Sequence, residues 1–92
     1  MLEEQRNKID NIDKQIVKLF EERMNTVVEI AKIKKENNMQ IFDSSRENLV
    51  IEKVKSYLEN KEIEEYLKEF YLELMKISKK YQKEIIDKDF KK

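Results

Sequence analysis

The chain contains neither glycine nor proline at any of its 92 positions. Glycine is the residue that most readily adopts the positive φ angles of tight hairpin turns, so a protein of many short strands would have no natural residue for its turns. Lys and Glu, the commonest residues here, are good helix formers. The sequence therefore predicts an all-α fold.

Apolar residues that recur at spacings of three and four indicate amphipathic helices. In the first helix these residues are Ile9, Ile12, Ile16, Leu19, Val27, Ile30 and Ala31. The same periodicity predicts three helices in a single domain over residues 1–92, at about 3–37, 44–59 and 62–87. We expect the second helix to bury Val50, Val54, Tyr57 and Leu58, and the third to bury Ile63, Leu67, Phe70, Leu74, Tyr81 and Ile85.

The expected helix ends carry residues suited to capping. Asn at positions 37 and 38 can adopt the left-handed conformation that ends a helix. Ser44, followed three residues later by Glu47, forms a capping box that predicts Ser44 as the N-cap of the second helix. Asn60 is the expected break between the second and third helices.

The first helix is too long for a compact domain of this size. Thirty-five residues rise roughly 50 Å along a helix axis, whereas a compact globule of this length has a radius of gyration of about 12 Å. The helix must overhang, and a second copy related by a twofold axis is the simplest cover for its exposed apolar stripe. We therefore expect an intertwined homodimer.

Composition excludes several functional classes. The 20 basic and 20 acidic residues balance, which removes the electrostatic basis for non-specific binding to nucleic acid or to an anionic membrane. The absence of Cys and His excludes thiolate chemistry and the commonest general base and metal ligand. No apolar run is long enough for a membrane span, and the N-terminus does not resemble a signal peptide. We expect a cytoplasmic protein, with a small anionic ligand still possible.

Two cations lie where apolar residues are expected. Arg23 and Lys34 fall in the middle of the first helix's stripe, and Arg6 lies near its edge. Burying an unpaired cation lowers the stability of the fold by several kcal/mol, so each must meet an anion from the protein or from a ligand. Alternatively, each is a long side chain that extends its charge to solvent while its stem covers the core.

The third helix has a similar polar pair, Ser78 and Gln82, which share a face four residues apart. A satisfied hydrogen-bonded pair in the core is one explanation. Together with Arg46 and Glu47, however, these residues suggest a polar chamber inside an otherwise apolar helix bundle.

Distances along the first helix suggest how such a chamber is completed. Arg23 and Lys34 lie about 16 Å apart, within joint reach of one small molecule, but Arg6 lies about 26 Å from Arg23. Arg6 cannot reach the site of its own chain. In an antiparallel pair of first helices it comes level with residues 28 to 34 of the partner and could complete the partner's site.

The order and spacing of these polar residues resemble the all-helical class of chorismate mutase, over about residues 3 to 86. The matching residues are Arg6, Arg23, Lys34, Asp43, Arg46, Glu47, Ser78 and Gln82. The resemblance implies a small, stand-alone enzyme with one activity, built as a domain-swapped six-helix homodimer. Each of its two sites would take seven residues from one chain and Arg6 from the other.

The resemblance further implies that the substrate is chorismate, rearranged to prephenate on the way to phenylalanine and tyrosine, with no cofactor and no metal. Arg6 of the partner, Arg23 and Arg46 would bind the two substrate carboxylates, assisted by Ser78. This agrees with the composition, because an intramolecular pericyclic step requires neither a nucleophile nor an acid-base pair.

The remaining roles also follow from the resemblance. Lys34 and Gln82 would donate hydrogen bonds to the ether oxygen, which gains negative charge in the transition state. Glu47 would accept from the ring hydroxyl, with Asp43 beside it.

The sequence leaves two other functions open. An isochorismate pyruvate-lyase shares the helical family, although the long connection and Lys34 favour the mutase. A non-catalytic helical dimerisation module would explain the apolar stripe without a ligand, but not the clustered polar residues.

Overall fold

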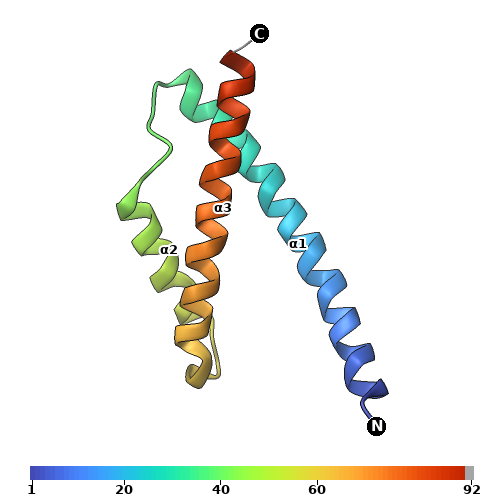
Figure 1. Cartoon of the computed structure of the whole chain (residues 1–92). Coiled ribbons are helices and arrows are strands. Elements are labelled where there is room, and N and C mark those ends of the chain that lie inside the picture. The colour runs from blue at the N-terminus through green and yellow to red at the C-terminus, as the bar shows by residue number, and fades with distance from the viewer. Residues whose placement is uncertain (91–92) are drawn as a thin grey trace.

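The computed structural model describes residues 1–90, and the side chains of residues 1–88. It contains α1 (Glu3–Glu36), α2 (Ser44–Ser56), the single 3₁₀ turn η1 (Lys61–Ile63) and α3 (Glu64–Phe90), with no strand in this part of the chain (Figure 1). The predicted all-α fold with three long helical segments is therefore confirmed. None of the helices within residues 1–90 combines the length and apolar character needed to span a bilayer.

α1 ends at an asparagine, as expected in a chain without glycine. Asn38 adopts a left-handed conformation with φ 53°. The Met39 N–H donates to the Lys34 carbonyl at 2.8 Å, and the Asn38 N–H donates to the Lys35 carbonyl at 3.3 Å. These two bonds form a Schellman motif, which satisfies carbonyls that the helix itself leaves unpaired.

α2 begins differently from the prediction. Asp43 is its N-cap, in an extended conformation with φ −140° and ψ 97°, and its carboxylate accepts from the Arg46 N–H at 3.1 Å. Ser44 is the first helical residue, so its assignment as the cap is wrong. A carboxylate at this position also interacts favourably with the positive end of the helix dipole, which contributes about 0.3 to 1 kcal/mol.

α2 also ends earlier than predicted, at Ser56 instead of residue 59. The Ser56 hydroxyl donates to the Lys53 carbonyl at 2.6 Å, and the Lys61 ammonium donates to the Lys55 carbonyl at 2.8 Å. Both bonds occupy carbonyls that another helical turn would have used. Asn60 then caps η1 by accepting from the Glu62 N–H at 3.1 Å, so the chain breaks at the expected asparagine.

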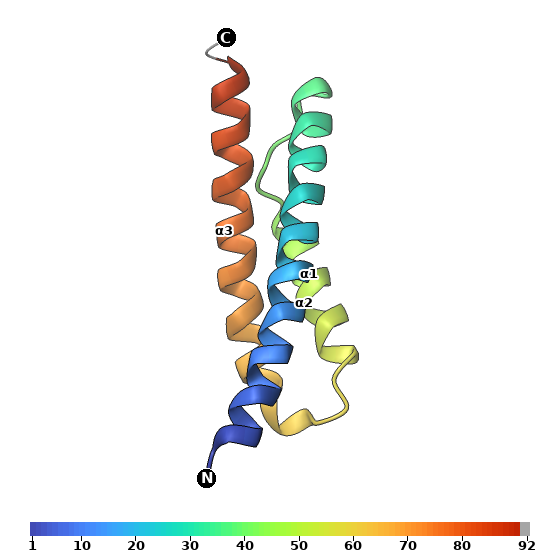
Figure 2. The same cartoon turned by 90° about the vertical axis from the view of Figure 1, so that its right-hand side faces the viewer.

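α3 is the central helix, because it packs against both α1 and α2, while within residues 1–90 the backbones of α1 and α2 do not approach each other closely. In Figure 1, α1 crosses α3 near the C-terminal ends of both helices and diverges from it toward the N-terminus of α1, and Figure 2 shows that the two helices run in the same direction. Among residues 1–88, the buried apolar residues are Val27, Ala31, Ile51, Val54, Leu74 and Met75. This small core lies between the second half of α1, α2 and the middle of α3.

The expected overhang of α1 is confirmed. Every residue from 1 to 22 is exposed, and the molecule measures 54 × 27 × 15 Å with a radius of gyration of 16.4 Å. Several predicted core residues are consequently exposed: Ile9, Ile12, Ile16 and Leu19 in α1, and Ile63 and Phe70 near the start of α3. They lie beyond the region in which the helices of one chain meet.

Tyr57 was also predicted to be buried, and this is wrong, since the residue is 75% exposed. It follows the last residue of the shortened α2 and therefore lies outside the helical face that packs on α3. Ile51 and Met75, which the prediction omitted, are buried instead.

Candidate active site

A pocket of about 280 Å³ lies between the second half of α1, the connection after it, the start of α2 and the second half of α3. This volume is close to the lower end of the range for small-molecule pockets, about 300 Å³. Its apolar wall consists of Val27, Ile30, Ile41, Val50 and Met75. Seven of the eight residues predicted from the sequence also line it: Arg23, Lys34, Asp43, Arg46, Glu47, Ser78 and Gln82.

Arg23 is anchored by Ser78 across the α1–α3 contact. Its Nη1 donates to the Ser78 hydroxyl at 2.6 Å, and this hydroxyl donates to the Leu74 carbonyl at 2.8 Å. Ser78 is only 5% exposed. The burial of this polar hydroxyl is explained by its two hydrogen bonds. Other guanidinium N–H groups of Arg23 remain available for a ligand.

Lys34 meets a carbonyl instead of an anion. Its Nζ donates to the Ile41 carbonyl at 2.8 Å, which ties α1 to the connection that leads to α2. An ammonium has three N–H donors, so two remain for a ligand. The expected protein anion is not found among the described residues, so the anion that Lys34 is expected to meet would have to come from a ligand.

Asp43 and Arg46 combine local structure with a place in the pocket. The Asp43 carboxylate accepts the Arg46 backbone N–H as described above, and both side chains line the pocket. Within the described part of the chain, the Arg46 guanidinium makes no ion pair. It is available for an anionic ligand.

Glu47 forms an ion pair that sequence reasoning missed. The Lys79 Nζ lies 3.0 Å from the Glu47 Oε2, and both side chains are partly buried. Lys79 also lines the pocket. It follows Ser78 directly and precedes Gln82 by three residues, so it could have been selected by its spacing on the same helix face.

Gln82 is 7% exposed, and its Oε1 has no hydrogen-bond partner among the described residues. A buried amide oxygen without a donor costs about 1–3 kcal/mol. The amide also carries two N–H donors, and a half-turn about its last torsion exchanges the oxygen and nitrogen positions. Gln82 therefore presents a polar group that a ligand in the pocket can satisfy.

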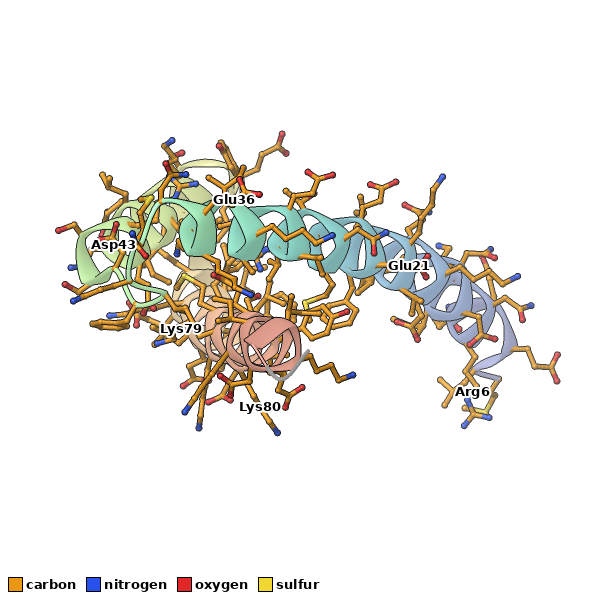
Figure 3. All side chains as sticks on the ribbon, turned by 90° about the horizontal axis from the view of Figure 1, so that it is seen from above. Arg6, Glu21, Glu36, Asp43, Lys79 and Lys80 are labelled. Atoms are coloured by element: carbon orange, nitrogen blue, oxygen red, sulfur yellow. The ribbon has the colours of Figure 1, made fainter. Side chains whose placement is uncertain are left out.

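Arg6 is the one predicted site residue that a single chain does not bring to the pocket. Figure 3 shows Arg6 near the N-terminus of α1, at the opposite end of the molecule from Asp43 and Lys79. It is exposed and does not line the pocket. This placement agrees with the expectation that Arg6 cannot reach the site of its own chain.

The pocket has an excess of positive charge although the whole chain is neutral. Its cationic side chains are Arg23, Lys34, Arg46 and Lys79, and its anionic side chains are Asp43 and Glu47. The excess is two positive charges, which suits a small dianion. Among residues 1–88, no three acidic side chains are placed to hold a metal ion.

A second, apolar hollow of about 470 Å³ adjoins this pocket. It lies between the middle of α1 and the first half of α3, where the two helices begin to diverge. Its apolar lining comprises Ile16, Val17, Leu19, Phe20, Phe70, Tyr71, Leu74 and Ile77. Arg23 lines both hollows, so the apolar surface leads directly to the polar pocket.

Comparison with known proteins agrees with this geometry. The family model described as chorismate mutase type II matches residues 5–83. A bifunctional chorismate mutase/prephenate dehydratase of Buchnera aphidicola subsp. Acyrthosiphon pisum (strain APS) is 51% identical over 49 residues. Its counterpart in Buchnera aphidicola subsp. Schizaphis graminum (strain Sg) is 45% identical over 49 residues.

Each of these alignments covers 53% of this chain but only 13% of the relative. The similarity to the two bifunctional enzymes is thus confined to a small part of their length. The family model, by contrast, extends over all three long helices and includes every residue predicted for the site. The chain belongs to the chorismate mutase type II family.

Proposed function

We propose that this chain catalyses the intramolecular rearrangement of chorismate to prephenate. The observation that carries the proposal is the convergence of Arg23, Lys34 and Arg46 on one small pocket that also contains Ser78 and Gln82. Family membership supports the same reaction.

The reaction suits a protein with neither histidine nor cysteine. In this pericyclic step a C–O bond breaks as a C–C bond forms within one molecule, so no covalent intermediate with the protein is required. The protein must hold a flexible dianion in a reactive shape and place hydrogen-bond donors where charge develops. Both tasks require fixed cations and amides.

In the proposed complex, Arg23 and Arg46 bind the substrate carboxylates together with Arg6 of the partner subunit. A guanidinium matches the two oxygens of a carboxylate with two parallel hydrogen bonds. The bond from Arg23 to Ser78 orients the guanidinium before the substrate arrives. Ser78 thereby assists carboxylate binding through Arg23.

Lys34 and Gln82 donate to the ether oxygen of the substrate in this proposal. The ether oxygen gains negative charge as its bond to carbon breaks, so donors placed there stabilise the transition state more than the ground state. The Lys34 ammonium is already oriented by the Ile41 carbonyl. Gln82 would present its amide N–H groups by the half-turn described above.

Glu47 accepts a hydrogen bond from the ring hydroxyl, and Asp43 lies beside it at the start of α2. The ion pair with Lys79 keeps the Glu47 carboxylate at the pocket wall. Asp43 has a double role in this proposal, because it caps α2 and also lines the pocket.

We further propose a domain-swapped homodimer of six long helices. The exposed stripe of α1 and the apolar hollow beside Arg23 together form a surface that requires a cover. The first half of a second copy's α1 has the matching apolar character and carries Arg6. Packing two antiparallel α1 helices would cover both stripes and bring Arg6 of each chain to its partner's pocket.

The proposal places the reaction in the cytoplasm, in the biosynthesis of phenylalanine and tyrosine, with residues 1–92 acting as one catalytic domain. The names of the Buchnera relatives combine this activity with prephenate dehydratase, which would consume its product. Prephenate formed by this chain would therefore be the substrate of a dehydratase reaction like that of the Buchnera relatives.

The direct test is an assay of the purified chain with chorismate, which follows the loss of chorismate absorbance and identifies the product by chromatography. We expect saturable formation of prephenate. A parallel reaction with isochorismate tests the lyase, which would release pyruvate. Absence of turnover, together with no saturable heat on titration with a transition-state analogue, would show that the chain is a dimerisation module.

A further inference from the structure

We propose that Lys79 is a positioning residue for Glu47. The Lys79 ammonium neutralises the Glu47 carboxylate and holds it toward the ring hydroxyl of the substrate. The inference rests on the proposed function and deepens it, because it adds a residue to the site that neither the sequence pattern nor the geometry of the ligand-binding arginines requires. It is carried by two contacts of the Lys79 ammonium and by the partial burial of the Lys79 side chain.

The first contact is the ion pair itself. The Lys79 Nζ lies 3.0 Å from the Glu47 Oε2, with 32% of the Lys79 side chain and 24% of the Glu47 side chain exposed. The pair joins α3 to the first turn of α2, whereas the pair of Lys55 with Glu52 lies within α2 at 4.0 Å. A partly buried pair between two helices is less screened by solvent than one on the surface.

The second contact is with the connection between α1 and α2. The Lys79 Nζ lies 4.6 Å from the centroid of the Phe42 ring, which is within the range of a cation–π interaction. The neighbouring Ile41 carbonyl accepts from Lys34. Two lysines from different helices therefore hold adjacent residues of the connection, immediately before Asp43 begins α2.

The third observation is that Lys79 differs from the other lysines near it. Lys76, Lys80 and Lys83 on the same helix are exposed, whereas Lys79 is half-buried and lines the pocket. In Figure 3, Lys80 lies on the side of α3 that faces away from α1. Lys79 is thus not one of the solvated cations of the outer helix face.

Charge explains why Glu47 needs such a partner. An ionised carboxylate in a pocket for a dianion would repel the substrate, and Asp43 adds a second negative charge to the same wall. The ammonium of Lys79 cancels the charge of Glu47 while leaving the second carboxylate oxygen free to accept a hydrogen bond. Glu47 can then accept a hydrogen bond from the ring hydroxyl without repelling the two substrate carboxylates.

The test uses Lys79→Met, with Lys80→Met as the matched control and Lys79→Arg as the conservative variant. With chorismate we expect Lys79→Met to lower kcat/KM about tenfold, Lys79→Arg to retain activity within about threefold, and Lys80→Met to match the wild type. Circular dichroism establishes that each variant keeps its helical fold.

A chorismate analogue without the ring hydroxyl separates positioning of Glu47 from a general structural role. We expect Lys79→Met to turn over this analogue within about twofold of the wild type, because the bond that Lys79 supports is absent. Adding Lys79→Met to Glu47→Gln should likewise cause no further loss with chorismate. Equal losses on both substrates, or additive losses in the double variant, would overturn the inference.

The same experiment distinguishes this inference from the proposed function. Absence of wild-type turnover of chorismate overturns both. Wild-type turnover with an unchanged Lys79→Met variant overturns only the role of Lys79.

Discussion

The two halves of α1 have the same apolar periodicity but different surroundings. From Arg23 onward the helix packs on α3, buries Val27 and Ala31 and contributes Arg23 and Lys34 to the pocket. From residue 1 to residue 22 every side chain is exposed, including Ile12 and Ile16. Periodicity therefore identifies the apolar face of a helix that must be covered, but not which chain covers it.

The largest expected effect comes from the packed half. Arg23→Ala should lower kcat/KM about a thousandfold, because it removes a carboxylate ligand and leaves Ser78 without its donor. Steady-state kinetics with chorismate measure this loss. Lys18→Ala, on the opposite face of the same helix, is the control and should have no effect. A loss of less than about threefold in Arg23→Ala would contradict the proposed site.

A charge in the exposed half should act through the partner. Ile16→Glu places a carboxylate in the apolar hollow, so we expect sedimentation equilibrium to show monomers and activity to fall about a hundredfold as Arg6 of the partner is lost. Lys18→Glu introduces the same residue on the outer face and should remain dimeric. A fully active Ile16→Glu monomer would show that the overhang has no role in the site.

Gln82 faces the packed half of α1 across the pocket, and its role can be tested by pH. A glutamic acid at this position donates a hydrogen bond only when protonated, which for an ordinary side chain occurs near and below about pH 4.3. Gln82→Glu should therefore lose about thirtyfold in kcat/KM at neutral pH and recover as the pH falls. A pH profile that matches the wild type would remove Gln82 from the mechanism.

The smallest expected effect joins the two halves in one experiment. Arg6→Ala and Arg23→Ala chains, each inactive alone, should recover about a quarter of wild-type activity when mixed in equal amounts. Half of the dimers are then mixed, and each contains one intact site. Activity is measured after subunit exchange has been established by mass spectrometry. No recovery would count against the sharing of Arg6 between chains.

Much of the fold could be predicted because it depends on local properties. Helix periodicity indicated all three helices, and the absence of glycine made Asn38 the natural left-handed residue at the end of α1. The choice between Asp43 and Ser44 could not be made this way, since both are good N-cap residues and their backbone conformations decide which one caps. The early end of α2 depended on side chains that compete for its last carbonyls.

Part of the site could also be predicted from the sequence, and part could not. Unusual polar residues on apolar faces marked Arg23, Lys34, Ser78 and Gln82, because burial makes such residues costly unless they have partners. Lys79 was missed because lysine is common on the outer face of this helix. Its spacing from Gln82 could have placed it near the pocket, but its ion pair with Glu47 depends on how α2 packs against α3.

Local sequence accounts for where the helices form, which faces are apolar and which polar residues interrupt those faces. These are properties of residues three and four positions apart, and helix geometry connects them directly. Three other features depend on how the helices pack: α3 lies between α1 and α2, Arg23 donates to Ser78, and Lys79 pairs with Glu47. Those contacts join residues far apart in the chain, so they depend on how the helices cross.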